Sequence, residues 1–169
     1  TDGRNEWVYF SDYSAGQTNN GKKWAAVRCE KPEFFTAGGF YSSAINVLLA
    51  SPITGDTIFY TLNGAEPTRS HYRYTPGSVI PITKTSIVRA RSFSGNKLAS
   101  DIASCTYFIR ERNFRLPVVS VITEQKNLTD NTIGIYVQGT NGIIGNGMKT
   151  PANWNQDWER PATLEYYDE

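Results

Sequence analysis

The chain has 169 residues, 39% of them hydrophobic, and a formal net charge of +1 at pH 7. This length and apolar content are enough for one domain with a buried core, or for one domain and part of a second. The small net charge argues against nucleic acid as the main partner, and no apolar run approaches the roughly 20 residues of a membrane-spanning helix.

Residues 1–29 are interpreted as an N-terminal arm or as the tail of a preceding β-domain. A short strand is expected around Trp7 and Phe10, and residues 16–21, rich in Gly and Asn, are typical of a turn or linker. The pattern D-G-x-x-x-W-x-x-F over residues 2–10 resembles the end of a lamin-tail-like β-domain. No signal peptide is recognisable, and the abrupt polar start leads us to expect a piece of a longer protein.

Residues 27–50 supply the first strands of the next domain, and residues 51–56 form a turn cluster. Ile45, Val47 and Leu49 are spaced two residues apart, so they share one face of a strand, as in a structure of two packed β-layers. A pair of adjacent glycines before them indicates a kink or bulge between the first two strands.

The most distinctive stretch covers residues 57–68, T-I-F-Y-T-L-N-G-A-E-P-T. Ile58, Tyr60 and Leu62 lie on one side of an alternating run, which predicts a strand with one buried face. The Asn-Gly pair that follows tolerates the positive φ of a tight turn, and the proline removes a backbone donor. The stretch therefore predicts a strand and a corner of a β-domain.

Residues 69–110 supply the remaining strands, with turn residues about every ten positions, which favours an all-β sandwich. Val88, Ala90 and Ser92 alternate with two arginines, so we expect a small, buried face and a solvated, charged one. His71, the only histidine, lies in a polar loop with no co-ligand or catalytic partner beside it, and we expect no function for it.

The pattern Y-T-x-[DN]-G-x-x-P-T over residues 60–68, with strand-like segments at familiar spacings around it, resembles the chitobiase/β-hexosaminidase C-terminal domain. The resemblance covers residues 30–110. It implies an immunoglobulin- or fibronectin-III-like β-sandwich that serves as a non-catalytic accessory module in exported multidomain proteins.

Residues 111–169 differ in character. Residues 116–122 form a continuous apolar strand, which we expect to be buried on both faces. The Gly-rich residues 139–147 are followed by no helical pattern and contain no G-K-[ST], so we expect a mobile loop and not a phosphate site. The series L-P-V-V-S, G-I-Y-V and W-E-R-P-A-x-x-E resembles the opening of the spore-coat-H (CotH) kinase-like domain, ending before that family's nucleotide-binding and catalytic residues.

Aromatic side chains are the candidate ligand contacts, because exposed rings can stack on sugars, although the same rings can fill a β-core. The candidates are Trp154, Trp158, Tyr72 and Tyr74. Cys29 and Cys105 fit no metal motif. The resemblance to an exported sandwich implies a disulfide between its first and last strands, and the alternative is a pair of unlinked thiols.

The sequence therefore predicts an all-β fold: an arm at residues 1–29, a sandwich at 30–110 and extra C-terminal strands at 111–169. We expect no catalytic, metal or cofactor site. The predicted function is a non-catalytic accessory or interaction module of a larger exported bacterial protein, in an extracellular, cell-surface or periplasmic location. Its expected partners are neighbouring domains of the parent chain and a glycan or cell-surface protein. The alternatives are a carbohydrate-binding module and, more weakly, a fragment of a CotH-type protein kinase.

Overall fold

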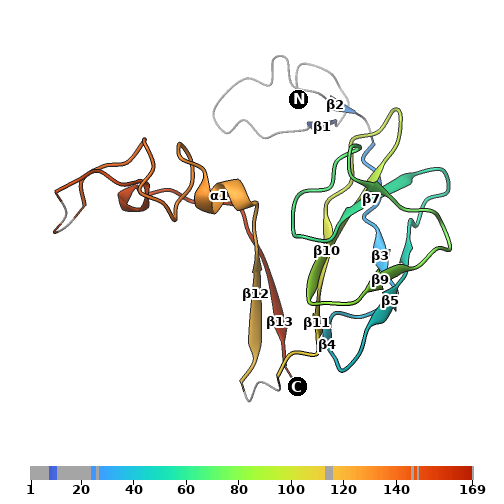
Figure 1. The fold of residues 1–169 in the computed structure, drawn as a ribbon. Helices are drawn as coiled ribbons and strands as arrows, with labels where there is room; N and C mark the ends of the chain where they lie inside the picture. Colours follow the sequence, from blue (N-terminus) through green and yellow to red (C-terminus); the bar gives the residue numbers. More distant parts are fainter. Residues whose placement is uncertain are drawn as a thin grey trace. The chain divides into compact units, whose positions relative to one another are not determined.

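The computed structural model describes residues 8–10, 24–25, 27–112, 116–145, 147 and 149–168. The chain divides into two compact units, Thr1–Glu111 and Arg112–Glu169 (Figure 1). In the N-terminal arm, β1 (Tyr9–Phe10) pairs antiparallel with β2 (Trp24–Ala25). Most of the lamin-tail-like pattern lies outside the described residues.

Five strands form the main sheet of the first unit, in the order β4-β11-β10-β7-β8. β11 runs parallel to β4, and the other neighbouring pairs are antiparallel. The strands are β4 (Gly39–Tyr41), β7 (Thr57–Thr61), β8 (Tyr72–Arg73), β10 (Ser86–Phe93) and β11 (Ala103–Ile109). The long strand β10 is thus the centre of the sheet, and β4 and β8 are its two edges.

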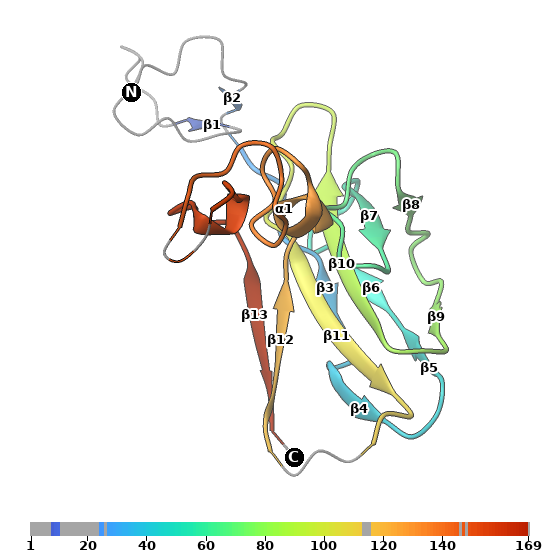
Figure 2. The same ribbon diagram turned by 60° about the vertical axis from the view of Figure 1, so that its left-hand side comes forward.

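Two short ladders form the second layer (Figure 2). β3 (Glu33–Phe34) pairs with β6 (Leu49–Ala50), and β5 (Ile45–Val47) pairs with β9 (Ile80–Ile82). These ladders and the main sheet enclose one core, made of Val47, Leu49, Ile58, Tyr74, Ile80, Ile82, Val88, Ala90, Tyr107 and Ile109. The predicted all-β sandwich is confirmed.

The alternation seen in the sequence sets the inner face of the two central strands. Ile58 of β7 is buried in the core, and Tyr60 and the following Leu62 pack against it. Val88 and Ala90 of β10 have no exposed surface. This small, buried face of β10 is the one that the sequence predicted.

The disulfide expected between Cys29 and Cys105 is not formed in this structure. Cys29 follows a short bridge between Arg28 and Leu98, and its N–H donates to the Leu98 carbonyl at 2.9 Å. Cys105 lies opposite Val88 in the β10–β11 ladder. The start of the sandwich therefore pairs with the connection between β10 and β11, and not with the middle of β11.

The second unit is built on a two-stranded antiparallel ribbon. β12 (Val118–Ile122) pairs with β13 (Thr163–Tyr167) over five residue pairs. Between them the chain forms α1 (Gln125–Thr129) and the 3-10 helix η1 (Asn153–Asn155). The first residue of each helix follows an extended residue that makes no side-chain cap.

One face of this ribbon is apolar and exposed. It consists of two cross-strand pairs, Val119 with Tyr166 and Val121 with Leu164, and each side chain is 55–68% exposed. Only Ile122, at the end of β12, is fully buried. The expectation of a strand buried on both faces was therefore wrong, because β12 is covered here on one face only. We call these four residues the apolar ribbon face.

The Gly-rich segment packs around η1. Asn153 is fully buried, its Nδ2 donates to the Asn131 carbonyl at 3.0 Å, and its Oδ1 accepts the N–H of Asn141 at 3.0 Å. A Cβ at Gly142 would lie 2.0 Å from the carbonyl carbon of Ala152. In its described part this segment is therefore joined to residues 152–153, and its mobility stays a prediction.

Candidate functional site

The signature segment forms a corner that begins where β7 ends. The Thr61 hydroxyl donates to the Ala65 carbonyl at 2.7 Å, and Oδ1 of Asn63 accepts the N–H of Ala65 at 3.2 Å. Gly64 has a φ of +78°, in the left-handed region that favours glycine. Side-chain bonds to the local backbone thus replace the sheet ladder and turn the chain.

Two arginines of β10 hold this corner against the outer face of the sheet. Arg89 donates to the Gly64 carbonyl at 2.9 Å, and Arg91 forms an ion pair with Glu66. Nε of Arg91 also donates to the Ser100 carbonyl at 2.6 Å. Because the corner covers it, Arg89 is only 9% exposed. The expected solvated, charged face of β10 was therefore wrong: the arginines fasten a loop.

Three tyrosines lie together at the β7–β8 edge of the sheet. The Tyr60 ring lies 5.5 Å from that of Tyr72, tilted by 32°, and 6.5 Å from that of Tyr74, edge-on. Burial raises the pKa of the Tyr60 phenol, and the two neighbouring phenols raise it further. Tyr72 remains 63% exposed.

Tyr74 is a core residue. It is 4% exposed, its hydroxyl donates to the Ser78 carbonyl at 2.6 Å, and its oxygen accepts the N–H of Leu49 at 3.2 Å. These contacts join the end of β8 to the second layer. Its ring is not available to a ligand, which removes it from the predicted ligand contacts.

Tyr72 lies on the wall of a cleft of about 690 Å³. Three segments form this cleft, which we call the Tyr72 cleft: the end of β7, the start of β8 and the connection from β9 to β10. The lining residues are Thr61, Leu62, Asn63, Ser70, His71, Tyr72, Pro81, Ile82, Thr83, Lys84 and Ser86. Its volume falls in the range of small-molecule sites, about 300–1,000 Å³.

The polar groups of the cleft are hydroxyls, one amide, one imidazole and one ammonium group. None of the described lining residues is acidic, and Lys84 supplies a positive charge. The N–H of Thr68 donates to Nδ1 of His71 at 3.0 Å, so Nε2 carries the hydrogen when the ring is neutral. The cleft therefore offers donors and a positive charge to a polar ligand.

The two predicted tryptophans belong to the second unit. Trp154 lies in η1 and is 46% exposed. The guanidinium of Arg160 lies 4.8 Å from the centre of the Trp158 ring, and its Nε donates to the Ile133 carbonyl at 2.9 Å. The W-E-R-P motif thus ties the entry of β13 to a neighbouring loop, and Arg160 occupies one face of Trp158.

Within the described residues no group of three or more His, Cys, Asp or Glu side chains could hold a metal ion, and no helix is long and apolar enough to cross a membrane. Near the end of the second unit, Glu165 accepts a hydrogen bond from the Tyr167 hydroxyl at 2.7 Å. Both residues of this contact lie within strand β13.

The comparison with known protein families concerns the first unit, which holds the corner, its two arginines and the sandwich. Residues 36–104 match the family model of the chitobiase/beta-hexosaminidase C-terminal domain. The match to this C-terminal domain spans the signature corner and most of the sandwich, and it supports a non-catalytic, Ig-like accessory module. No curated protein and no solved structure matches the chain. The comparisons give no support for the CotH or lamin-tail resemblances.

The sequence identified Tyr72 but not the cleft beside it. His71 and Lys84 lie 13 positions apart, and they line one cleft only because the fold places residues 70–72 near the β9–β10 connection. The one available signal was local: a polar loop with an aromatic residue follows directly after the signature corner.

Proposed function

We propose that this chain is a non-catalytic interaction module of a larger exported bacterial protein, working at the cell surface, in the periplasm or outside the cell. The match to the chitobiase/beta-hexosaminidase C-terminal domain carries this proposal. The corner supports it, because Arg89 and Arg91, placed on a strand face where phosphate contacts would be sought, are engaged in holding the fold.

In the same proposal, the second unit is the opening part of a further domain of the parent protein, of the CotH kinase-like type. The apolar ribbon face supports this part. A single monomeric domain seldom leaves large, contiguous apolar side chains uncovered, and here four of them lie next to each other on two paired strands. Further strands or helices of a parent domain would cover them.

Cell fractionation tests the proposal. An antibody raised against the purified chain should detect, in the source cells, a polypeptide longer than 169 residues in the surface, periplasmic or culture fraction. A cytosolic enzyme followed in the same fractions is the control for lysis. A band found only in the fraction that holds the cytosolic control would overturn the proposal that the protein is exported.

One observation favours a second function, the binding of carbohydrate. The Tyr72 ring is 63% exposed and lies on the wall of a cleft lined by hydroxyl, amide and imidazole groups. A pyranose ring has an apolar C–H face and a rim of hydroxyls, so it complements an exposed aromatic ring surrounded by polar groups. Binding of simple sugars to the chain, lost on Tyr72→Ala, tests this second function.

A further inference from the structure

The Tyr72 ring is an aromatic platform on the wall of the Tyr72 cleft. It contacts the ring of Tyr60, whose own side chain packs against the sandwich core. A ring fixed in this way loses little side-chain freedom when a ligand stacks on it, which favours binding. The exposed part of Tyr72 is therefore suited to the C–H face of a sugar.

Donors surround this platform. Oδ1 of Asn63 accepts the N–H of Ala65, which leaves the NH₂ group of the amide to donate elsewhere. Nδ1 of His71 accepts from Thr68, so the neutral imidazole donates through Nε2. Both residues line the cleft, and their donors suit ligand oxygens that accept hydrogen bonds.

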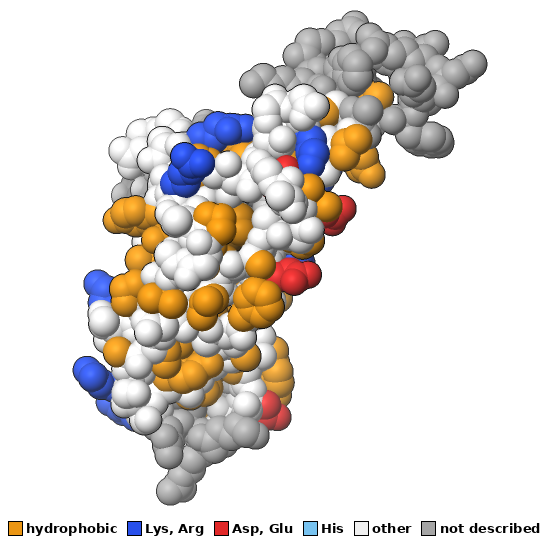
Figure 3. Space-filling view, turned by 90° about the vertical axis from the view of Figure 1, so that its right-hand side faces the viewer, with side chains coloured by type: hydrophobic (Ala, Val, Ile, Leu, Met, Phe, Trp, Pro, Cys, Tyr) orange, Lys and Arg blue, Asp and Glu red, His pale blue; other side chains and the backbone are white. Residues whose placement is uncertain are grey.

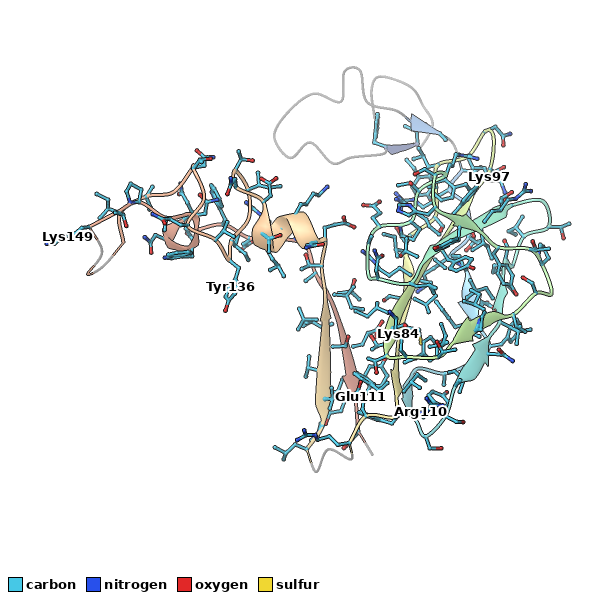
Figure 4. All side chains as sticks on the ribbon, in the orientation of Figure 1. Lys84, Lys97, Arg110, Glu111, Tyr136 and Lys149 are labelled. Carbon is cyan, nitrogen blue, oxygen red and sulfur yellow. The ribbon has the colours of Figure 1, made fainter. Side chains whose placement is uncertain are left out.

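The side-chain charge that lines the cleft is positive. Lys84, labelled in Figure 4, lies on the connection between β9 and β10. It lines the cleft, and none of the described lining residues is acidic. The next residue, Thr85, donates its hydroxyl to Glu111. The ion pairs resolved among the described residues join Arg28 to Asp101, Arg91 to Glu66 and Lys97 to Asp56. None of them uses Lys84.

From these three features we infer that the Tyr72 cleft binds an acidic sugar, a hexuronate residue of a glycan, with the ring on Tyr72 and the carboxylate beside Lys84. This inference rests on the second function proposed above. On the face drawn in Figure 3, Lys and Arg side chains lie only in small groups, with other polar and apolar side chains between them.

Titration calorimetry with the 169-residue chain tests the inference, with trigalacturonic acid, glucuronic acid, galactotriose and glucose as the probes. We expect the acidic sugars to bind more tightly than their neutral counterparts. Tyr72→Ala should abolish binding of all four. Lys84→Gln should weaken only the acidic sugars, by about fivefold, as expected for one exposed ion pair.

Two matched control variants lie in the second unit, and both are labelled in Figure 4. Tyr136→Ala removes a tyrosine that is 81% exposed, and Lys149→Gln removes an exposed lysine. Neither should alter binding. Equal affinity for neutral and acidic sugars, lost on Tyr72→Ala, would overturn the acidic ligand and keep carbohydrate binding. No binding of any probe would overturn both, and binding unchanged by Tyr72→Ala would overturn the site.

Discussion

Comparing Arg91→Met with Glu66→Gln separates the two side-chain contacts of Arg91. The guanidinium of Arg91 donates to the Ser100 carbonyl at 2.6 Å and forms an ion pair with Glu66. Ser100 has no exposed surface, whereas the Glu66 side chain is 47% exposed. Methionine keeps most of the length of the side chain but removes both contacts.

The two contacts have different expected magnitudes. A buried acceptor that loses its donor costs about 1–3 kcal/mol. The ion pair is partly exposed and screened by solvent, so it contributes about 0–1 kcal/mol. Arg91→Met should therefore lower the free energy of unfolding of the first unit by about 2–3 kcal/mol. Glu66→Gln, which removes only the charge pair, should lower it by less than about 1 kcal/mol.

Thermal unfolding followed by circular dichroism measures the difference. For a domain of this size about 1 kcal/mol shifts Tm by roughly 4–8 °C, so Arg91→Met should lower Tm by about 10 °C or more. Added salt should remove the effect of Glu66→Gln and leave most of the effect of Arg91→Met, because salt screens exposed charge pairs. Two equal, small shifts, or an Arg91→Met effect that disappears in high salt, would refute the buried contact.

Further variants test other parts of the fold. Tyr74→Phe leaves a buried backbone N–H without its acceptor and should lower unfolding stability by about 1–3 kcal/mol in denaturant titrations. Gly142→Ala should destabilise the second unit, since its Cβ would meet backbone at 2.0 Å, whereas Gly95→Ala, in open space, should not lower Tm. Burial, followed by the charge of Asp56, raises the pKa of the Cys29 thiol above its ordinary 9.0, so the folded chain holds this proton more tightly than the unfolded chain does. The free energy of unfolding should therefore fall as pH rises above 9. This fall should be smaller in Cys29→Ser. Alkylation of the denatured, unreduced chain should add a group to each cysteine, and an unalkylated pair would show a disulfide.

Local patterns in the sequence predicted what depends on local periodicity. The inner faces of β7 and β10 followed from alternation at Ile58, Val88 and Ala90, and the corner followed from its Asn-Gly pair. A period of two shows which residues share a face, but it does not show what covers that face. The sequence could therefore predict a sandwich, but not how its two layers are aligned.

Features that depend on distant segments could not be read in this way. Arg89 was expected in solvent, yet a loop 25 positions earlier folds back and buries it. The exposed Val119 and Val121 show the opposite case, since an apolar run looks the same whether one face or two are covered. The close approach of Gly142 to Ala152 leaves no mark in the sequence, so the packing at this position could not be predicted.

The central claim is that the first unit is a self-standing Ig-like module. Its most direct test is an isotope-edited nuclear Overhauser spectrum of residues 27–111, made without the rest of the chain. We predict a dispersed β-type spectrum in which Ala90 contacts both Tyr60 and Ala103, its partners on the two sides of β10, and Phe40 contacts Phe108 across the parallel β4–β11 pair. A collapsed spectrum, or a spectrum in which Ala90 contacts neither Tyr60 nor Ala103, would contradict the account.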